Sequence, residues 1–100
     1  MWQVEIHPLV WEEDLGKLDQ SARIRITKAI REKLASSPTT FGKPLGGILK
    51  GYWRLRVGPY RVMYRVEQHR LVVIVAKVGI RRDEQIYLEA LPRLRQLGWL

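Results

Sequence analysis

The alternation of apolar and polar residues predicts a strand and two helices in the first third of the chain. Residues 2–7 alternate in the way typical of a short strand, and Pro8 suits the first turn of a helix that runs through Leu18. Asp19 is a good N-cap residue, and apolar side chains recur at helical spacing from there to Leu34. This recurrence predicts the second helix.

Turn residues and apolar runs predict three further strands. Residues 36–38 end the second helix, and residues 39–47, rich in glycine and in turn-forming residues, are expected to form a loop. Strands are then expected at about residues 50–57, 60–67 and 70–78. The last of these is apolar at both odd and even positions, which point to opposite faces of the sheet, so we expect an internal strand that is covered on both faces.

A last helix completes the expected fold. It is predicted from Asp83 to Leu97, with Ile86, Ala90 and Leu94 facing inward. The predicted fold class is therefore α+β, with a small antiparallel or mixed sheet of about four strands, two N-terminal helices and one C-terminal helix. A length of 100 residues fits a single domain, residues 1–100.

The first hairpin predicts that two arginines lie opposite each other. Residues opposite each other in an antiparallel pair point to the same face of the sheet. We favour a four-residue loop over residues 57–60, because Pro59 is a poor second residue in a two-residue hairpin loop. Either loop leaves Arg56 opposite Arg61, so this pairing does not depend on the loop length.

The second hairpin is expected to turn at residues 68–69. That turn places Arg65 opposite Val72 and Arg61 opposite Ala76. The two hairpins together divide the sheet into an apolar and a basic face.

One predicted face is apolar and the other is basic. The apolar face holds Trp53, Leu55, Val57, Tyr60, Val62, Tyr64, Val66, Leu71, Val73 and Val75. The basic face holds Arg54, Arg56, Arg61 and Arg65, with Met63 among them and Lys50 near its edge. Opposed like charges weaken a hairpin, and a bound phosphate would compensate, because guanidinium groups match phosphate oxygens. Alternatively, the arginines pair with carboxylates elsewhere or face water.

The composition agrees with an anionic partner. Lys and Arg number 18 against 10 Asp and Glu, a net charge of +8, which is typical of proteins that bind nucleic acid or an acidic protein, although a solvated basic surface is the alternative. The absence of cysteine excludes disulfides, thiolate metal sites and a cysteine nucleophile. The apolar run at 71–78 is far below the ~18 residues that cross a bilayer, and the first residues do not read as a signal peptide. We predict a cytoplasmic protein that does not bind membranes.

Two motifs, "YRVMYRV" at 60–66 and "VGIRRDEQIY" at 78–87, together with "KPLGG" at 43–47, make the sequence similar to RelE-type toxins of the RelE/ParE superfamily. The similarity covers most of the chain. It implies a RelE-like fold and a toxin that cuts mRNA in the ribosomal A site without a metal or other cofactor, which inhibits translation. It also implies a cognate antitoxin, in a toxin–antitoxin hetero-oligomer, and the ribosome and mRNA as further partners.

Metal-independent RNA cleavage needs a base for the ribose 2′-hydroxyl, a cationic clamp for the phosphate and support for the leaving 5′-oxygen. The two histidines, His7 and His69, are expected to be structural or exposed. By resemblance, Tyr87 takes the 2′-hydroxyl proton, Arg61 steadies the phosphate, and Arg81 stabilises the transition state and the leaving oxygen. A free tyrosine has a pKa near ~10, and nearby arginines would favour its phenolate form.

Other basic residues are candidates for binding phosphate, and some of the candidate residues have alternative roles. The phosphate-binding candidates are Lys50, Arg54, Arg56, Arg65 and Arg82. Tyr87 could instead be an ordinary helix residue, and Arg81 a solvated partner of Asp83 or Glu84. The basic helix residues Arg23, Arg25, Lys28 and Arg31 could contact ribosomal RNA or face water.

One departure from the family pattern affects the base. Close relatives often carry two lysines where this chain has Tyr52 and Arg54. Arg54 keeps the positive charge but cannot act as a base, because arginine stays protonated. Proton abstraction therefore depends more on Tyr87.

Two other functions stay open from the sequence. A ParE-like toxin would inhibit DNA gyrase by protein contact and usually lacks the catalytic set. A catalytically silent RNA-binding module would use the arginines only to hold phosphate. Residues 98–100 form an apolar end that packs on the core or meets a partner.

Overall fold

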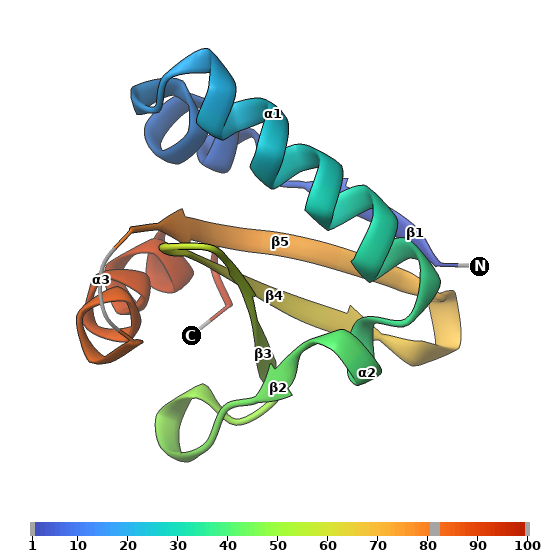
Figure 1. The fold of residues 1–100 in the computed structure, drawn as a ribbon. Helices are drawn as coiled ribbons and strands as arrows, with labels where there is room; N and C mark the ends of the chain where they lie inside the picture. Colours follow the sequence, from blue (N-terminus) through green and yellow to red (C-terminus); the bar gives the residue numbers. More distant parts are fainter. Residues whose placement is uncertain (1, 81–82, 100) are drawn as a thin grey trace.

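A computed structural model of the chain describes residues 2–80 and 83–99. The described residues form a five-stranded mixed sheet in the order β1-β5-β4-β3-β2 (Figure 1). The strands are β1 (Gln3–Ile6), β2 (Lys43–Pro44), β3 (Tyr52–Val57), β4 (Tyr60–Glu67) and β5 (Val72–Gly79). β1 runs parallel to β5, and the other neighbours are antiparallel. The predicted α+β class is confirmed.

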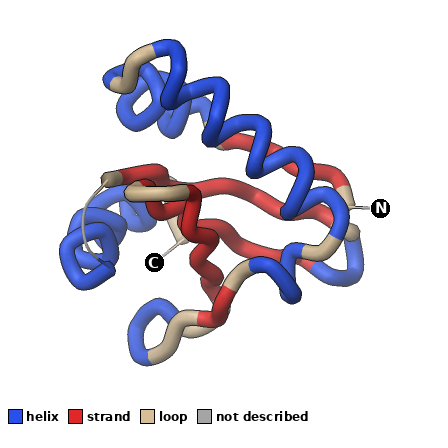
Figure 2. The backbone as a smooth tube through the Cα atoms, viewed as in Figure 1, coloured by secondary structure: helices blue, strands red, loops and turns tan. Residues whose placement is uncertain are grey.

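The helices are α1 (Gln20–Ala29), α2 (Pro38–Phe41) and α3 (Asp83–Gln96), with π-helical turns η1 (Val10–Asp14) and η3 (Ile30–Leu34) and 3₁₀ turns η2 (Leu15–Lys17), η4 (Gly47–Leu49) and η5 (Gln68–Arg70). The predicted first helix therefore consists mainly of π and 3₁₀ turns. Asp19 caps α1 as predicted, since its carboxylate accepts a hydrogen bond from the Ala22 amide at 2.8 Å. Figure 2 shows the two N-terminal helical segments as a hairpin joined by a short turn. No helix of the described part is long and apolar enough to cross a membrane.

The stretch predicted as a loop after residue 38 contains two short elements. Pro38 opens α2, as suits a residue whose missing amide is not needed in a first helical turn. Lys43 and Pro44 pair with Arg54 and Trp53 and add β2 at the edge of the sheet. A two-residue strand carries no alternating pattern, so this fifth strand depends on its partner and could not be read from local sequence.

The hairpin between β3 and β4 has the predicted face but a shorter loop. Arg56 lies opposite Arg61, and Val57 pairs with Tyr60, so the predicted four-residue loop is wrong. Gly58 takes a positive φ of 57° at the first turn position. A two-residue turn of this kind needs positive φ only at its first residue, as in type II′ turns, so proline fits at the second.

The turn between β4 and β5 is longer than predicted. Gln68–Arg70 form a 3₁₀ turn, and Leu71 follows in the left-handed region with φ 52°. Arg65 therefore lies opposite Ile74 rather than Val72. A shift of two residues leaves each side chain on the predicted face. Leu71, which was placed on the apolar face, is instead exposed in the turn.

A β-bulge changes the register further along the same strand pair. It lies between Met63 and Tyr64 on β4. Because β5 accommodates one extra residue there, Arg61 lies opposite Gly79 rather than Ala76. The bulge has no local sequence signal.

The sheet is covered on both faces, as predicted for its internal strand. The first core cluster joins the predicted apolar face to the N-terminal helical layer, with Val10, Leu15, Ile26, Ile30, Leu34, Leu55, Val57, Val62, Tyr64, Val73, Val75 and Val78 buried. The second lies on the other face, under α3, with Leu49, Tyr52, Met63, Ala76, Ala90 and Leu94 buried. The basic face is therefore only partly open, because α3 packs over its centre.

Candidate nucleic-acid interface

The predicted basic face exists on β3 and β4. Arg56 lies directly opposite Arg61, and Arg54 lies opposite the buried Met63. Arg65 is two residues beyond Met63 on β4 and therefore points to the same side. Four arginines thus share one face, along the two strands of a single hairpin.

Arg61 is held at the tip of this hairpin by the backbone. Its Nη1 donates to the carbonyl oxygen of Tyr60 at 3.2 Å and to that of Gly58 at 3.4 Å. These bonds occupy one nitrogen of the guanidinium group. They fix the group beside the turn without neutralising its charge.

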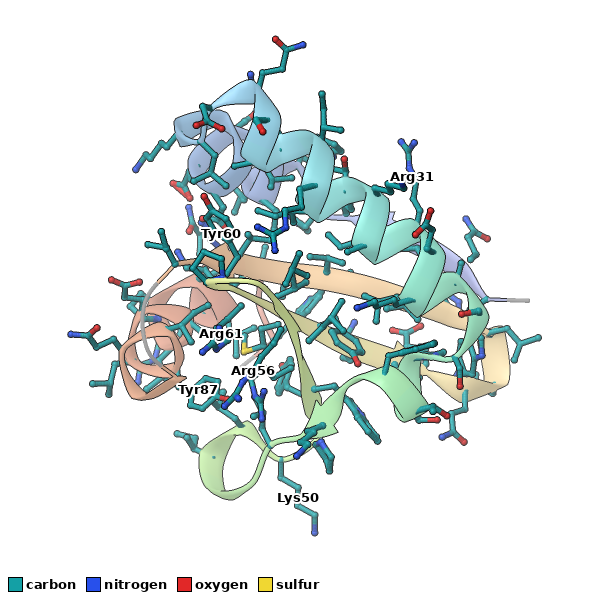
Figure 3. All side chains as sticks on the ribbon, in the orientation of Figure 1. Arg31, Lys50, Arg56, Tyr60, Arg61 and Tyr87 are labelled. Carbon is teal, nitrogen blue, oxygen red and sulfur yellow. The ribbon has the colours of Figure 1, made fainter. Side chains whose placement is uncertain are left out.

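Tyr87 comes to this face from α3. It is partly buried and packs against the cluster that contains Met63, the residue two positions along the strand from Arg61. In Figure 3 Arg56, Arg61 and Tyr87 point into the same space between the β3–β4 hairpin and α3. The structure thus brings together a phenol and two guanidinium groups that the sequence predicted as a site.

Not every predicted site residue joins this group. Lys50 is exposed and points away from it in Figure 3. Arg81 and Arg82 lie outside the described residues, between the end of β5 and the start of α3.

Arg65 is engaged by the protein itself. Its guanidinium lies over the ring of Trp99, 3.8 Å from the ring centroid, and its Nη2 forms an ion pair with Glu67 at 3.0 Å. The Tyr52 ring stacks on the Trp99 ring, with 6.3 Å between the ring centroids. Burial raises the pKa of Tyr52, although the nearby charge of Arg65 partly offsets this. The C-terminal Trp99 therefore packs on the sheet, and Tyr52, which stands where relatives often carry a lysine, belongs to the core.

The histidines occupy the structural and exposed positions expected of them. The Nδ1 atom of His7 accepts a hydrogen bond from the Leu9 amide at 3.1 Å. His69 lies exposed in the turn before β5. Within residues 2–80 and 83–99 no group of three or more His, Asp or Glu side chains could hold a metal ion.

A buried ion cluster among η1, β5 and α3 was not predicted from the sequence. Asp14 and Arg93 form two hydrogen bonds of 2.9 Å each. Asp14 also accepts from the Val78 amide at 2.9 Å and from Lys77 Nζ at 3.2 Å. Glu13 pairs with Arg93 at 3.0 Å. This cluster ties η1, β5 and α3 together and so fixes the helix that carries Tyr87.

Chemically, the arrangement suits a phosphodiester. Two opposed guanidinium groups can hold phosphate oxygens and stabilise extra negative charge on them. A phenol on the facing helix can exchange a proton with a nearby hydroxyl.

A sequence model described as the ParE toxin of the type II toxin–antitoxin system parDE matches residues 4–85 of the chain. The chain belongs to this toxin family. The matched range includes β3, β4 and β5 with all the arginines of the basic face.

Two curated toxins are similar over most of this toxin's length. The mRNA interferase toxin RelE of Escherichia coli is 34% identical over 79 residues, which cover 78% of this chain and 82% of that protein. The toxin RelG of Mycobacterium tuberculosis is 31% identical over 70 residues, covering 70% of this chain and 80% of RelG. The resemblance to RelE-type toxins is therefore confirmed.

Solved structures agree on the fold. The toxin–antitoxin complex RelBE2 of Mycobacterium tuberculosis contains a chain that superposes with a TM-score of 0.76 at 28% identity, covering 82% of this toxin and 93% of that chain. The isolated E. coli RelE toxin gives a TM-score of 0.65 at 24% identity, with coverage of 94% and 99%. The RelE-like fold predicted from the sequence is confirmed.

Proposed function

We propose that this toxin is a ribosome-dependent endoribonuclease that cuts mRNA in the ribosomal A site and thereby inhibits translation. The observation that carries the proposal is the convergence of Arg56, Arg61 and Tyr87 between the β3–β4 hairpin and α3. The name of the E. coli relative, an mRNA interferase, supports the same reaction class.

The proposed reaction uses the RNA's own ribose as the nucleophile. Tyr87 takes the proton of the 2′-hydroxyl, and the 2′-oxygen forms a bond to the adjacent phosphorus. Arg61 and Arg56 hold the phosphate oxygens as their negative charge increases. The bond from phosphorus to the 5′-oxygen then breaks, leaving a 2′,3′-cyclic phosphate and a 5′-hydroxyl, and we assign support of that leaving oxygen to Arg81. No metal is required for these steps.

The remaining basic residues receive supporting roles. We propose that Arg54 and Arg82 contact neighbouring phosphates. Arg65 contributes its positive charge while its guanidinium packs against the Trp99 ring. Lys50 points away from Arg56, Arg61 and Tyr87, and we therefore assign it to a more distant part of the RNA.

The toxin is proposed to act in the cytoplasm, away from membranes, and to be held inactive by a cognate antitoxin in a hetero-oligomer. The solved RelBE2 complex of a structurally similar toxin supports such a partner. An acidic or amphipathic antitoxin segment would complement a chain of net charge +8.

A second candidate is inhibition of DNA gyrase by direct protein contact. It is favoured by the matched family model, which describes a ParE toxin. A gyrase supercoiling assay separates the two functions: an endonuclease leaves supercoiling unchanged at concentrations that cleave mRNA, whereas a gyrase inhibitor blocks supercoiling and leaves mRNA intact.

The proposal is tested by adding purified toxin to a cell-free bacterial translation reaction and mapping mRNA 5′ ends by primer extension. New ends at A-site codons are expected. They should weaken strongly with Arg61→Gln, Arg81→Ala or Tyr87→Phe, and persist with Arg70→Gln, which removes an exposed charge at the other end of β4. Intact mRNA would contradict the proposal, and if RNA were bound without being cut, the toxin would be a silent RNA-binding module.

A further inference from the structure

A second arginine approaches the hairpin tip from the helical layer. Gly58 lies in the turn between β3 and β4, and a Cβ atom added there would be 2.5 Å from Nη2 of Arg25, 2.9 Å from Cζ and 3.0 Å from Nη1. The Arg25 guanidinium on α1 therefore lies directly over the turn. A side chain at position 58 would displace it.

Arg61 approaches the same glycine from the sheet. Its Nη1 bonds the Gly58 carbonyl oxygen at 3.4 Å. Because both guanidinium groups lie close to atoms of one residue, they are within about 10 Å of each other, given backbone bond lengths. That is close to the Debye length of about 8 Å at physiological salt, so solvent ions screen their repulsion only in part.

Arg25 has no acidic partner in the described part of the chain. It is exposed, and among residues 2–80 and 83–99 its side chain forms no hydrogen bond or ion pair. Other arginines differ, since Arg65 pairs with Glu67 and Arg93 with Asp14. Arg25 is thus a guanidinium with no carboxylate partner of its own in the described part, held near a second guanidinium, and an external anion stabilises such a cation.

We propose that Arg25 and Arg61 form a second phosphate-binding site at the hairpin tip, which binds an RNA backbone phosphodiester next to the one that is cut in the proposed reaction. The inference rests on the proposed function. RNA is favoured over an acidic peptide because Arg61 also takes part in the proposed cleavage, so a strand held there continues onto Arg25. Backbone contacts of this kind position RNA without reading its sequence.

Arg31 provides a matched control for Arg25. Both arginines are exposed in the same helical segment, and neither side chain has an ion pair among the described residues. Arg31 points away from the hairpin in Figure 3. Arg25→Gln and Arg31→Gln remove the same charge, so a difference between them reports position rather than net charge.

The test measures binding of a fluorescent RNA oligonucleotide made resistant to cleavage by 2′-O-methyl groups, from about 50 to 200 mM salt. Arg25→Gln should weaken binding roughly threefold to tenfold, equally for two unrelated sequences, and reduce the slope of log K against log salt by about 0.7. Arg31→Gln should change either value much less. Thermal unfolding checks that both variants are folded.

A second arm measures binding to ribosomes programmed with an mRNA that contains the sequence of the oligonucleotide. Weaker binding of Arg25→Gln to both the free oligonucleotide and the ribosome is expected, because the phosphodiester belongs to the strand that Arg61 holds. Weaker binding to ribosomes alone would assign the phosphodiester to ribosomal RNA and would contradict the proposal. Equal behaviour of the two variants in both arms, or weakened binding of an acidic antitoxin peptide alone, would overturn the proposal.

The two proposals fail separately. If the wild-type toxin cuts mRNA but Arg25→Gln binds RNA normally, only the hairpin-tip site is wrong. If the toxin cuts nothing while the Arg25 dependence of RNA binding persists, the site is present and the endonuclease proposal is wrong.

Discussion

Asp14 and Arg93 form a buried two-bond ion pair that joins the N-terminal helical layer to α3. Both side chains are almost fully buried, and the two bonds of 2.9 Å use both carboxylate oxygens. The Val78 amide and the Ala76 carbonyl, both on β5, complete the pair. Because α3 also carries Tyr87, this pair sets where the phenol lies relative to the arginines of the hairpin.

Breaking the pair from one side should destabilise the fold strongly. Asp14→Ala leaves the Arg93 charge buried and poorly compensated, which typically costs about 3–5 kcal/mol. Glu13→Gln is the control, since Glu13 contacts the same guanidinium at 3.0 Å but its side chain is 45% exposed, and exposed pairs contribute about 0–1 kcal/mol. Urea unfolding measures both variants. Similar losses in the free energy of unfolding for the two variants would show that the buried pair does not stabilise the fold more than the exposed one.

Alkaline pH should weaken the fold through Tyr64. Burial raises the Tyr64 pKa well above its usual value, although Arg54 lowers it, and its hydroxyl donates to the Pro38 carbonyl oxygen at 2.6 Å. The folded state therefore holds this proton more tightly than the unfolded state. The stabilisation is fully present below the unfolded pKa of about 10 and is lost as pH rises beyond it.

This pH effect is measured by urea unfolding at about pH 8 and pH 10.5, on either side of the ordinary tyrosine pKa. Tyr64→Phe should be less stable at the lower pH, by about 1 kcal/mol for the lost hydrogen bond. It should also lose less stability than the wild type on going to the higher pH. Tyr52, whose pKa burial also raises, contributes in the same direction and is unchanged in both proteins. Equal losses would show that Tyr64 does not carry the effect.

Gly42 is required by close packing rather than by its backbone angles. Its φ is −93°, which any residue can adopt. An added Cβ, however, would fall on the Tyr64 hydroxyl, 2.8 Å from Tyr64 Cζ and 3.0 Å from the Arg54 carbonyl oxygen. We expect Gly42→Ala to destabilise the fold by about 1–3 kcal/mol, as overpacking usually does.

Gly46→Ala is the matched control for this change, because an added Cβ there meets nothing within 4 Å. Chemical denaturation should show a small effect for Gly46→Ala. In the double variant with Tyr64→Phe, part of the Gly42→Ala loss should disappear, since the phenol oxygen is gone. Fully additive losses would mean that the hydroxyl is not the group in the way.

The sequence predicted the faces of the sheet better than its registers. Arg65 pairs with Ile74 of β5, two positions from the predicted partner Val72, and a register difference of an even number of residues leaves its side chain on the basic face. The side chain of Leu71, by contrast, was misplaced because a left-handed residue ends the turn there. Turn conformation and the bulge at Met63 depend on the whole strand pair, so local patterning could not supply them.

The placement of three candidate residues could be predicted from the RelE-like motifs and from the alternation of side chains along the strands. Arg56, Arg61 and Tyr87 were all named from the sequence, and they converge in space. The Asp14–Arg93 pair was not predicted, because its partners lie 79 positions apart and no local pattern links them. The sequence predicts Arg65 only as a phosphate ligand, since nothing in it shows that Trp99 packs against the Arg65 guanidinium. The roles assigned to Arg56, Arg61, Tyr87, Arg81 and Arg82 all stay predictions.

The central claim is attack of a 2′-hydroxyl on a phosphate held between the hairpin and α3. Its most direct test is single-turnover cleavage on ribosomes programmed with an mRNA that carries one 2′-deoxynucleotide 5′ to the scissile phosphate. We predict that the all-ribose mRNA is cut to a 2′,3′-cyclic phosphate, that the deoxy mRNA stays intact, and that Tyr87→Phe cuts the all-ribose mRNA about 10²–10⁴-fold more slowly. Cleavage of the deoxy mRNA at the wild-type rate, or no cleavage of either mRNA, would contradict the account.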